Sequence, residues 1–332
     1  MKSVVERPRG RVAVLFPGQG AQCPGMGLDL AHAYPFTAGK VMRTADRVAG
    51  FRLTSLIENA SPRVLARTDI TQPALVAASL AAWRALMTEL PGFVPAFAAG
   101  LSLGEYTALA AAEVLDDEDV LRLVTWRGRY MEEAARGHRG GMCAVLGLER
   151  GVVEALCRES ASSGAGRVWV ANYNAPGQCV ISGEQGALKL AAGLSASRGG
   201  KVVPLKVSGP FHSPLMGRAG RRLAALLATA SVRTPRFPVY SNAAGRPYTG
   251  PESLVRGLER QVSSPVLWED IVRDMDLQGV ELFVEVGPGR TLASLVRRIL
   301  PGAEVIGVSD TESLARAVEV LRPLVAGGGA AR

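Results

Sequence analysis

A glycine-flanked serine places the tightest constraint on how this chain can fold. The pentapeptide GLSLG at 100–104 lies between a short apolar run at 95–99 and an alanine-rich stretch at 105–114. The run predicts a buried strand and the stretch predicts a helix, so the pentapeptide is a sharp strand-to-helix turn. Such a turn exposes its central side chain, and glycine at both ends avoids clashes. The pattern predicts that Ser102 is a nucleophile, with the positive end of the following helix favouring an oxyanion beside it.

Apolar runs elsewhere predict further strands around this turn. Residues 11–16 precede a PGQG loop, and 282–285 form a similar run near the end of the chain. Helices are predicted at 74–90, directly after a Thr-Gln-Pro triplet at 71–73, and at 116–135. Strands that alternate with helices in this way are typical of the α/β class.

The segment 138–207 has a different pattern. Strands are predicted at 142–148, 168–171, 178–182 and 202–207, with helices near 152–160 and 186–196 and a turn at 172–177. The resulting β-α-β-β-α-β order is typical of a ferredoxin-like unit. The sequence therefore predicts a small ferredoxin-like subdomain over 138–207, inserted into a large subdomain made of 1–137 and 208–332.

The three histidines leave few candidates for a general base beside Ser102. His32 lies in a segment that looks helical, and His138 lies in a loop of glycine and arginine. His212 follows a Gly-Pro turn directly after a predicted strand, a place that can fix an imidazole at the edge of a cleft. By elimination we infer that His212 is the base. The usual α/β-hydrolase order, with an acid and then a histidine near the chain end, fits less well.

Five motifs occur in one order along the chain. They are FPGQGAQ at 16–22, GLSLGEY at 100–106, WRG at 126–128, GPFH at 209–212 and EVGPG at 285–289. Together they resemble the malonyl-CoA:acyl-carrier-protein transacylase family, and the GLSLGEY form resembles the trans-acting acyltransferases of polyketide synthases. The resemblance spans about residues 11–300. It implies an α/β-hydrolase-like large subdomain with an inserted ferredoxin-like small subdomain, in agreement with the pattern of segments.

The resemblance also implies a reaction. Ser102 takes a malonyl group from coenzyme A as an ester and passes it to the phosphopantetheine thiol of an acyl carrier protein. His212 deprotonates the serine and later the thiol, in a ping-pong cycle. The backbone carbonyl of Gln261 orients His212, and the backbone N–H groups of Gln19 and Leu103 form the oxyanion hole. No cofactor is bound permanently, because the coenzyme A thioester is itself the substrate.

A second set of residues is expected to bind the acyl group. Arg127, in the WRG motif, matches the family arginine that grips the malonyl carboxylate, a task that suits the planar fork of a guanidinium. Gln72, Asn172 and Asn174 fall in the motifs TQPAL and NYNAPGQ, which line the cleft in the family.

One position departs from the commonest family pattern, and a second position bears on which acyl group is accepted. Leu101 stands where the commonest form of the turn has a histidine, so a second imidazole is missing while nucleophile and base remain. Phe211 precedes His212, and a bulky residue there goes with unbranched malonyl because the ring fills the volume that an α-methyl group needs. One methyl group supports discrimination of only about 1–3 kcal/mol.

Composition excludes several other functions. The 38 basic and 30 acidic residues give a net charge of +8, but the basic residues are scattered and aromatics make up only 5%. A nucleic-acid groove is therefore not expected, whereas the phosphates of coenzyme A and an acidic carrier protein fit the charge. Three histidines and four cysteines without a CxxC pair predict no metal site. The longest apolar stretch, 93–115, is interrupted by proline, glycine and glutamate, and 1–10 has no signal-like core, so no membrane span and a cytoplasmic location are expected.

Two alternatives remain open from the sequence. One is an acyl hydrolase, or an acyltransferase for a different acyl group, on the same fold. Arg127 argues against it, because an apolar pocket would leave a buried guanidinium unpaired. The other is a non-catalytic subunit that docks a carrier protein, for which Leu101 is the only hint.

Overall fold

The computed structural model describes residues 11–327, and residues 1–10, which enter the expectation about targeting, lie outside this range. Its elements follow in chain order: β1 (Val12–Phe16), α1 (Leu28–Ala33), α2 (Ala38–Ala49), α3 (Leu53–Asn59), α4 (Pro62–Leu65), α5 (Thr68–Glu89), β2 (Phe97–Gly100), α6 (Gly104–Ala111), α7 (Asp117–Arg136), β3 (Gly140–Leu146), α8 (Arg150–Ser162), β4 (Val168–Ala175), β5 (Gln178–Glu184), α9 (Gln185–Ser197), β6 (Lys201–Pro204), η1 (Pro214–Met216), α10 (Gly217–Leu227), β7 (Tyr240–Ser241), β8 (Arg246–Pro247), α11 (Pro251–Gln261), α12 (Trp268–Leu277), β9 (Leu282–Val286), α13 (Thr291–Ile299), β10 (Glu304–Val308) and α14 (Thr311–Gly327).

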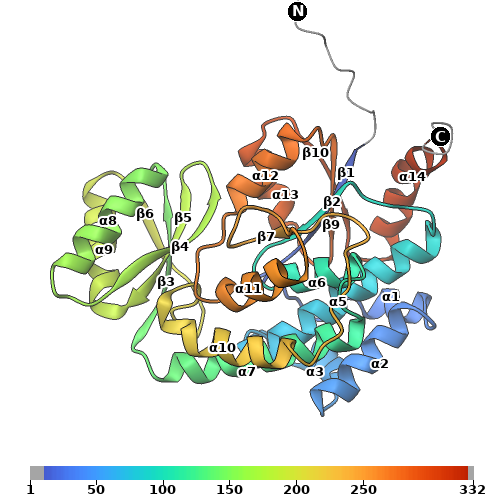
Figure 1. Cartoon of the computed structure of the whole chain (residues 1–332), viewed down its shortest axis with the longest axis horizontal. Helices are drawn as coiled ribbons and strands as arrows, with labels where there is room; N and C mark the ends of the chain where they lie inside the picture. The colour runs from blue at the N-terminus through green and yellow to red at the C-terminus, as the bar shows by residue number, and fades with distance from the viewer. Residues whose placement is uncertain (1–10, 328–332) are drawn as a thin grey trace, which may run out of the picture.

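A parallel sheet with the strand order β10-β9-β1-β2 forms the centre of the larger part of the molecule (Figure 1). Side chains alternate across β1, as they must in a strand. Val12, Val14 and Phe16 join the core that α5 and α6 cover. Ala13 and Leu15 join a second core on the other face, under α12 and α13. The chain is thus an α/β protein whose parallel sheet is covered by helices on both faces.

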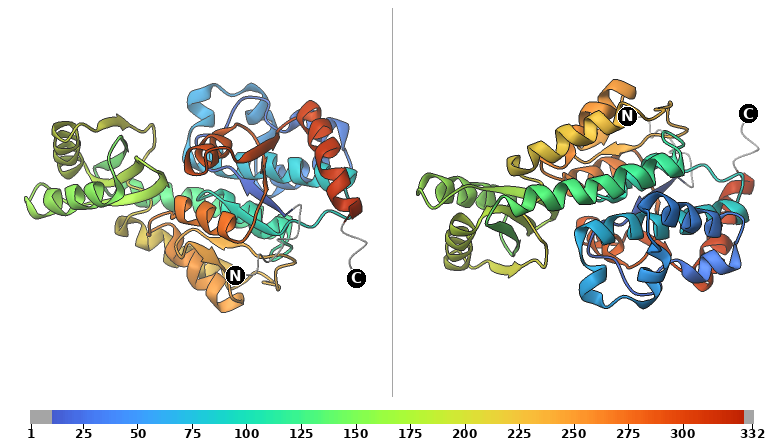
Figure 2. Two further views of the ribbon diagram at one scale, coloured as in Figure 1. Left: turned by 90° about the horizontal axis from the view of Figure 1, so that it is seen from above. Right: turned by 90° about the horizontal axis from the view of Figure 1, so that it is seen from below.

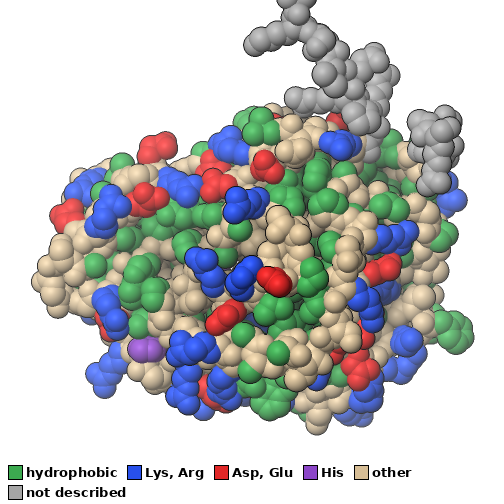
Figure 3. All heavy atoms as spheres, viewed as in Figure 1, with side chains coloured by type: hydrophobic (Ala, Val, Ile, Leu, Met, Phe, Trp, Pro, Cys, Tyr) green, Lys and Arg blue, Asp and Glu red, His purple; other side chains and the backbone are tan. Residues whose placement is uncertain are grey.

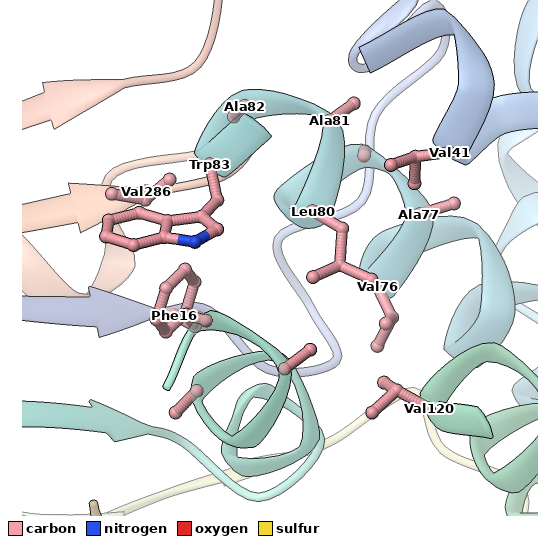
Figure 4. Packing of buried hydrophobic residues seen from close by; sticks show 14 of the residues in the cluster. Phe16, Val41, Val76, Ala77, Leu80, Ala81, Ala82, Trp83, Val120 and Val286 are labelled. Carbon is pink, nitrogen blue, oxygen red and sulfur yellow. The ribbon is translucent and has the colours of Figure 1, made fainter. Parts of the chain in front are cut away.

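Helix α5 is the buried centre of the first core, since almost every position along it is hidden from solvent. A helix that is apolar on all sides needs neighbours on all sides. Trp83 lies against Phe16 of β1 in an edge-to-face arrangement, with the ring centroids 6.1 Å apart, and beside Val286 of β9 (Figure 4). This contact packs the helix against the strand whose end carries the loop 17–20.

The start of α5 differs from the sequence prediction. A helix at 74–90 after the triplet 71–73 is wrong at its beginning, because α5 begins at Thr68 and contains Pro73. A proline at this point costs the helix one bond to the carbonyl of Asp69, a residue that is only partly buried. The earlier start puts Gln72 inside the helix.

The second sheet is antiparallel, with the strand order β4-β5-β3-β6, and lies with α8 and α9 at one end of the molecule (Figure 2). Its elements follow the β-α-β-β-α-β order that the sequence predicts. The predicted turn at 172–177 is wrong, because β4 continues to Ala175 through two irregularities in its pairing with β5. Asn172 and Asn174 are therefore strand residues.

The two sheets meet beside the end of α11. The segment that follows α11 pairs with β4, where Val266 N–H donates to Ala171 O and Tyr173 N–H donates to Val266 O, both at 2.9 Å. Arg150 of α8 forms an ion pair with Asp270 of α12 at 2.9 Å.

Within residues 11–327, no helix combines the length and the apolar content that crossing a bilayer requires.

Candidate active site

Ser102 occupies the sharp turn between β2 and α6, at the carboxyl end of the parallel sheet. Its φ is 51°, in the left-handed region that an L-residue avoids. The turn needs both of its glycines, because the backbone comes too close for a side chain. A Cβ at Gly104 would lie 2.0 Å from Phe16 O, and one at Gly100 would lie 1.9 Å from the carbonyl carbon of Gly104. The strand-to-helix geometry expected from GLSLG is therefore present.

His212 is buried, and its imidazole Nε2 lies 2.7 Å from the Oγ of Ser102. The other ring nitrogen, Nδ1, lies 2.9 Å from the backbone carbonyl of Gln261. A carbonyl can only accept, so Nδ1 carries the proton and Nε2 is left to accept one from the serine. The other two histidines are elsewhere: His32 is exposed on α1, and His138 lies in the loop after α7.

The end of α11 explains why a carbonyl is available to the imidazole. The last carbonyls of a helix have no partner within it. Gln261 is the final residue of α11, and its carbonyl accepts from the His212 ring, while the next carbonyl, of Val262, accepts from the His212 backbone N–H at 3.1 Å. Ring and backbone of His212 are thus held by adjacent peptide groups.

Burial, together with the positive charge of Arg127, lowers the pKa of His212 to about 4. The protonated form loses water on burial and meets a nearby cation, and both effects favour the neutral ring. At neutral pH the imidazole is therefore unprotonated on Nε2.

Arg127 lies on α7 with 1% of its surface exposed. Asp116, whose carboxylate accepts from the N–H of Asp119 at 2.7 Å, caps the start of this helix. The guanidinium donates through Nη1 to the side-chain oxygen of Gln72 at 2.9 Å, and through Nη2 to Ser102 Oγ at 3.0 Å. No carboxylate within residues 11–327 forms an ion pair with it, and its Nε has no hydrogen-bond partner there. A buried cation beside the serine can thus receive a carboxylate.

A polar network that the sequence motifs do not predict lies directly behind the turn. Asn242 accepts from Ser102 N–H at 2.5 Å and donates to Gly100 O at 2.7 Å. The side chain of Gln261 donates to Ser102 O at 2.7 Å. The fully buried Glu105 accepts from the same Gln261 amide and contacts the hydroxyl of Tyr248. The only available signal was an acid in the otherwise apolar helix after the turn.

The backbone amides of Gln19 and Leu103 lie on the two loops that meet at the turn. Gln19 follows β1, and Leu103 directly precedes α6, whose first N–H groups have no helical acceptor. The loops are in contact, because a Cβ at Gly18 would lie 2.3 Å from Leu101 O. Neither amide donates a backbone hydrogen bond within the described residues.

The remaining expected residues surround this centre to different degrees. Phe211 is buried beside Met131 in an apolar cluster next to His212, and Leu101 is half-buried against the core under α12. Asn172 and Asn174 are buried in β4, and within residues 11–327 no hydrogen bond joins either side chain to Ser102, His212 or Arg127. A cavity of about 450 Å³ opens beside His212 between α8, β4 and the segment 263–265.

The site offers no evident place for a metal ion within the described part of the chain, because no three His, Cys, Asp or Glu side chains gather there. What the arrangement can do is acyl transfer. A neutral imidazole can take the proton of Ser102 Oγ, and free amides stand on the adjoining loops.

Comparisons with known proteins agree with this chemistry. A family model described as the acyl transferase domain matches residues 14–317. The malonyl CoA-acyl carrier protein transacylase of Haemophilus influenzae is 37% identical over 312 residues, which cover 94% of this chain and 99% of that protein. The polyketide biosynthesis protein ThaF of Burkholderia thailandensis is 43% identical over 291 residues, 87% of this chain but 24% of that protein.

Solved structures give the same result. A malonyl-transacylase in complex with its type II polyketide synthase acyl-carrier protein superposes with a TM-score of 0.89 at 38% identity, covering 94% of this chain and 100% of that chain. Fold and site together define the class of α/β acyltransferases. Within that class, the chain belongs to the malonyl-CoA:acyl-carrier-protein transacylase family.

Proposed function

We propose that this chain transfers a malonyl group from coenzyme A, through an ester of Ser102, to the phosphopantetheine thiol of an acyl carrier protein. One observation carries the proposal: the Oγ of Ser102 lies 2.7 Å from a neutral imidazole and 3.0 Å from a buried guanidinium that has no carboxylate partner in the described chain. The pairing supplies a nucleophile and a receptor for an acyl group that carries its own carboxylate.

In the first half of the reaction, His212 Nε2 takes the proton of Ser102 as Oγ attacks the thioester carbonyl of malonyl-CoA. The tetrahedral oxyanion accepts hydrogen bonds from the N–H groups of Gln19 and Leu103. The carbon–sulfur bond then breaks, and the proton on His212 passes to the departing thiolate of coenzyme A. Each oxyanion donor contributes on the order of 3–4 kcal/mol in related acyl transfer.

In the second half, the thiol of the carrier arm takes the place of coenzyme A. His212 removes its proton, the thiolate attacks the Ser102 ester, and the proton returns to Ser102 Oγ as the ester bond breaks. The carbonyl of Gln261 keeps the proton of the ring on Nδ1 through both halves. His212, Ser102 and the Gln261 carbonyl are the catalytic group, and no permanently bound cofactor takes part.

Arg127 binds the malonyl carboxylate, and Gln72 holds the guanidinium by accepting from Nη1, the terminal nitrogen that does not contact the serine. Phe211 excludes an α-methyl group, because its ring is packed in an apolar cluster and has little room to move. Leu101, Asn172 and Asn174 line the path of the thioester arm. The net charge of +8 suits the phosphates of coenzyme A and an acidic carrier protein.

We assign the parallel sheet to an α/β-hydrolase-like large subdomain of 1–137 and 208–332. The antiparallel sheet belongs to a ferredoxin-like small subdomain of 138–207, which the β-α-β-β-α-β order supports. The reaction takes place in the cytoplasm, where coenzyme A thioesters are made, and the four free thiols fit a reducing compartment. The product serves polyketide or fatty-acid synthesis, and the likeness to ThaF supports the former.

The test is incubation of the purified chain with malonyl-CoA, followed by intact mass. A gain of one malonyl group is expected, lost in Ser102→Ala and discharged by a phosphopantetheinylated carrier protein. Folded protein that gains no malonyl group contradicts the proposal and favours a docking subunit. Release of free malonate at the rate of the carrier reaction favours an acyl hydrolase.

Arg127→Ala tests the receptor for the carboxylate. Loss of a charge-assisted pair should lower kcat/KM for malonyl-CoA on the order of 100-fold, with much less effect on acetyl-CoA. Arg136→Ala, at the exposed end of the same helix, is the matched control and should change neither. Equal losses for the two substrates would contradict the role of Arg127.

A further inference from the structure

A buried carboxyl group lies under the nucleophile turn and takes no part in the steps above. Glu105 is the second residue of α6 and is fully buried. Its Oε2 accepts from the side-chain Nε2 of Gln261 at 2.7 Å and from the backbone N–H of Asn242 at 3.2 Å. Its Oε1 contacts the hydroxyl of Tyr248.

The side-chain amide of Gln261 connects this carboxyl group to the acyl receptor. Its Nε2 donates to Glu105, and its Oε1 accepts from Arg127 Nη2 at 3.0 Å. A carboxylate can only accept and a guanidinium can only donate. One orientation of the amide therefore satisfies both neighbours, and Glu105 selects it.

The same amide separates two buried opposite charges. Within residues 11–327, Arg127 has no ion-pair partner. The acidic groups that act on it are Tyr106, whose pKa burial raises to about 12, and Glu105, which lies across Gln261. The groups that face Glu105 are Arg127 from α7, Tyr248 from the segment after β8, and its neighbour Tyr106 on α6. Arg127 is thus the one cation acting on this carboxyl group among the described residues.

We propose that Glu105 is a positioning residue for Arg127, acting through the Gln261 amide, and that its charge competes with the substrate carboxylate for the same guanidinium. The inference rests on the proposed function, in which Arg127 receives a malonyl carboxylate. A second anion beside Arg127 is repelled by ionised Glu105 and not by neutral Glu105. Selection of malonyl over an uncharged acyl group is therefore strongest when Glu105 is protonated.

Glu105 changes its ionisation near neutral pH, where the enzyme can be assayed. Burial raises its pKa to about 7, while Tyr248, Gln261, Asn242 and Arg127 act in the opposite direction. Because the ionised form predominates above this pKa, malonyl selectivity should decline as pH rises through neutrality.

The measurement is the ratio of kcat/KM for malonyl-CoA to kcat/KM for acetyl-CoA between about pH 6 and pH 9. Titration of His212 and of the coenzyme A phosphates affects both substrates and cancels in the ratio. For the wild type we expect the ratio to fall by about tenfold as Glu105 ionises. Glu105→Gln retains an oxygen that can accept from Gln261 but carries no charge, so its ratio should stay high and independent of pH.

Tyr248→Phe gives an independent test that keeps Glu105. The hydroxyl of Tyr248 lowers the pKa of Glu105 by hydrogen bonding, so its removal should move the fall in the ratio to higher pH. Tyr34→Phe is the matched control. Tyr34 directly follows α1 and donates to Glu89, at the end of α5, at 2.9 Å, so its replacement should leave the profile unchanged.

The outcomes separate the inference from the function on which it rests. A ratio in the wild type that does not change with pH, an unaltered slope in Glu105→Gln, or an unmoved midpoint in Tyr248→Phe would each overturn the inference. If the wild type forms no malonyl ester at all, it is the proposed function that fails.

Discussion

Backbone strain in this protein coincides with the two groups that meet at the site. Among residues 11–327, the non-glycine residues with positive φ are Ser102, His212 and Glu113, at 51°, 56° and 61°. Each such residue costs on the order of 1–2 kcal/mol. Two hydrogen bonds offset this cost: Ser102 N–H donates to the side chain of Asn242, and His212 N–H donates to the carbonyl of Val262. They hold both side chains toward each other.

The lowered pKa of His212 gives a prediction for acid pH. A base works only while unprotonated, and here the ring stays neutral down to about pH 4, well below its ordinary value of 6.5. With acetyl-CoA, which brings no carboxylate, the rate of Ser102 acylation should hold steady as pH falls through 6.5 and decline near 4. Stopped-flow or rapid-quench rates across this range check it.

Arg127→Ala is the matched variant for this profile. Arg127 lowers the pKa of His212 by its positive charge, so the acid limb should move to higher pH when that charge is removed. Circular dichroism at each pH distinguishes loss of the base from unfolding. A wild-type decline centred near 6.5, or a shift to lower pH in the variant, would refute the assignment.

Residue types and spacing predict Ser102 and His212, whereas Arg127 is implied only by the resemblance to the family. In the structure, His212 Nε2 lies 2.7 Å and Arg127 Nη2 lies 3.0 Å from Ser102 Oγ. The network behind them could not be found in this way. Glu105 was visible as a lone acid in an apolar helix, but Asn242 and Tyr248 lie about 140 positions away, and their approach depends on tertiary packing.

At the scale of the elements, α6 can begin only where its first residue has no side chain. In Gly104→Ala the added Cβ would meet backbone atoms of Phe16 and Pro17, which cannot move without disturbing β1. We expect a loss of more than about 3 kcal/mol in the free energy of unfolding, measured by urea denaturation.

Gly193→Ala is the control of opposite sign. Gly193 is an exposed interior residue of α9 with nothing within 4 Å of an added Cβ. Replacing glycine by alanine there should stabilise the protein by about 0.5–1 kcal/mol, because alanine has the higher helix propensity. If both variants are equally destabilised, the cost at Gly104 is not the clash with β1.

Element boundaries were predicted less well than element types. Proline favours a helix start at 74 and asparagine favours a turn at 172–177, yet α5 contains Pro73 and β4 contains Asn172 and Asn174. Both local preferences are weak against packing. Helix α5 is buried along its length, and β4 is held by β5 on one side and by Val266 on the other.

At the scale of the whole molecule, the net charge predicts how the enzyme meets its carrier protein. The face shown in Figure 3 carries Lys and Arg interspersed with Asp and Glu, and the chain as a whole has a net charge of +8. Encounter with an acidic carrier protein should therefore be steered by long-range attraction. We expect kcat/KM for the carrier protein to fall several-fold between about 20 and 200 mM salt, with kcat unchanged.

Free pantetheine is the control acceptor for this measurement. It bears the same thiol without a charged protein, so its kcat/KM should vary little with salt. Equal salt dependence for the two acceptors would show that the charge of the molecule does not guide the carrier protein.

The order of strands in the parallel sheet could not be predicted from the sequence. Local patterns indicated strands at 11–16, 95–99 and 282–285, but not that β1 lies between β9 and β2. These neighbours come from segments far apart in the chain, so no local pattern reports their pairing.

The carbonyl that orients His212 has a consequence for how this enzyme tolerates genetic change. Where a carboxylate side chain accepts the hydrogen bond that orients an imidazole, a single substitution can remove that acceptor. Here the acceptor is the backbone carbonyl of Gln261, and every amino acid has the same carbonyl. Point mutation at that position can disturb Arg127 and Glu105, yet it leaves the support of the imidazole in place. Only a change in chain length near 261–262 would shift it, so a substitution there should leave the His212 ring held, whereas an insertion or a deletion should release it.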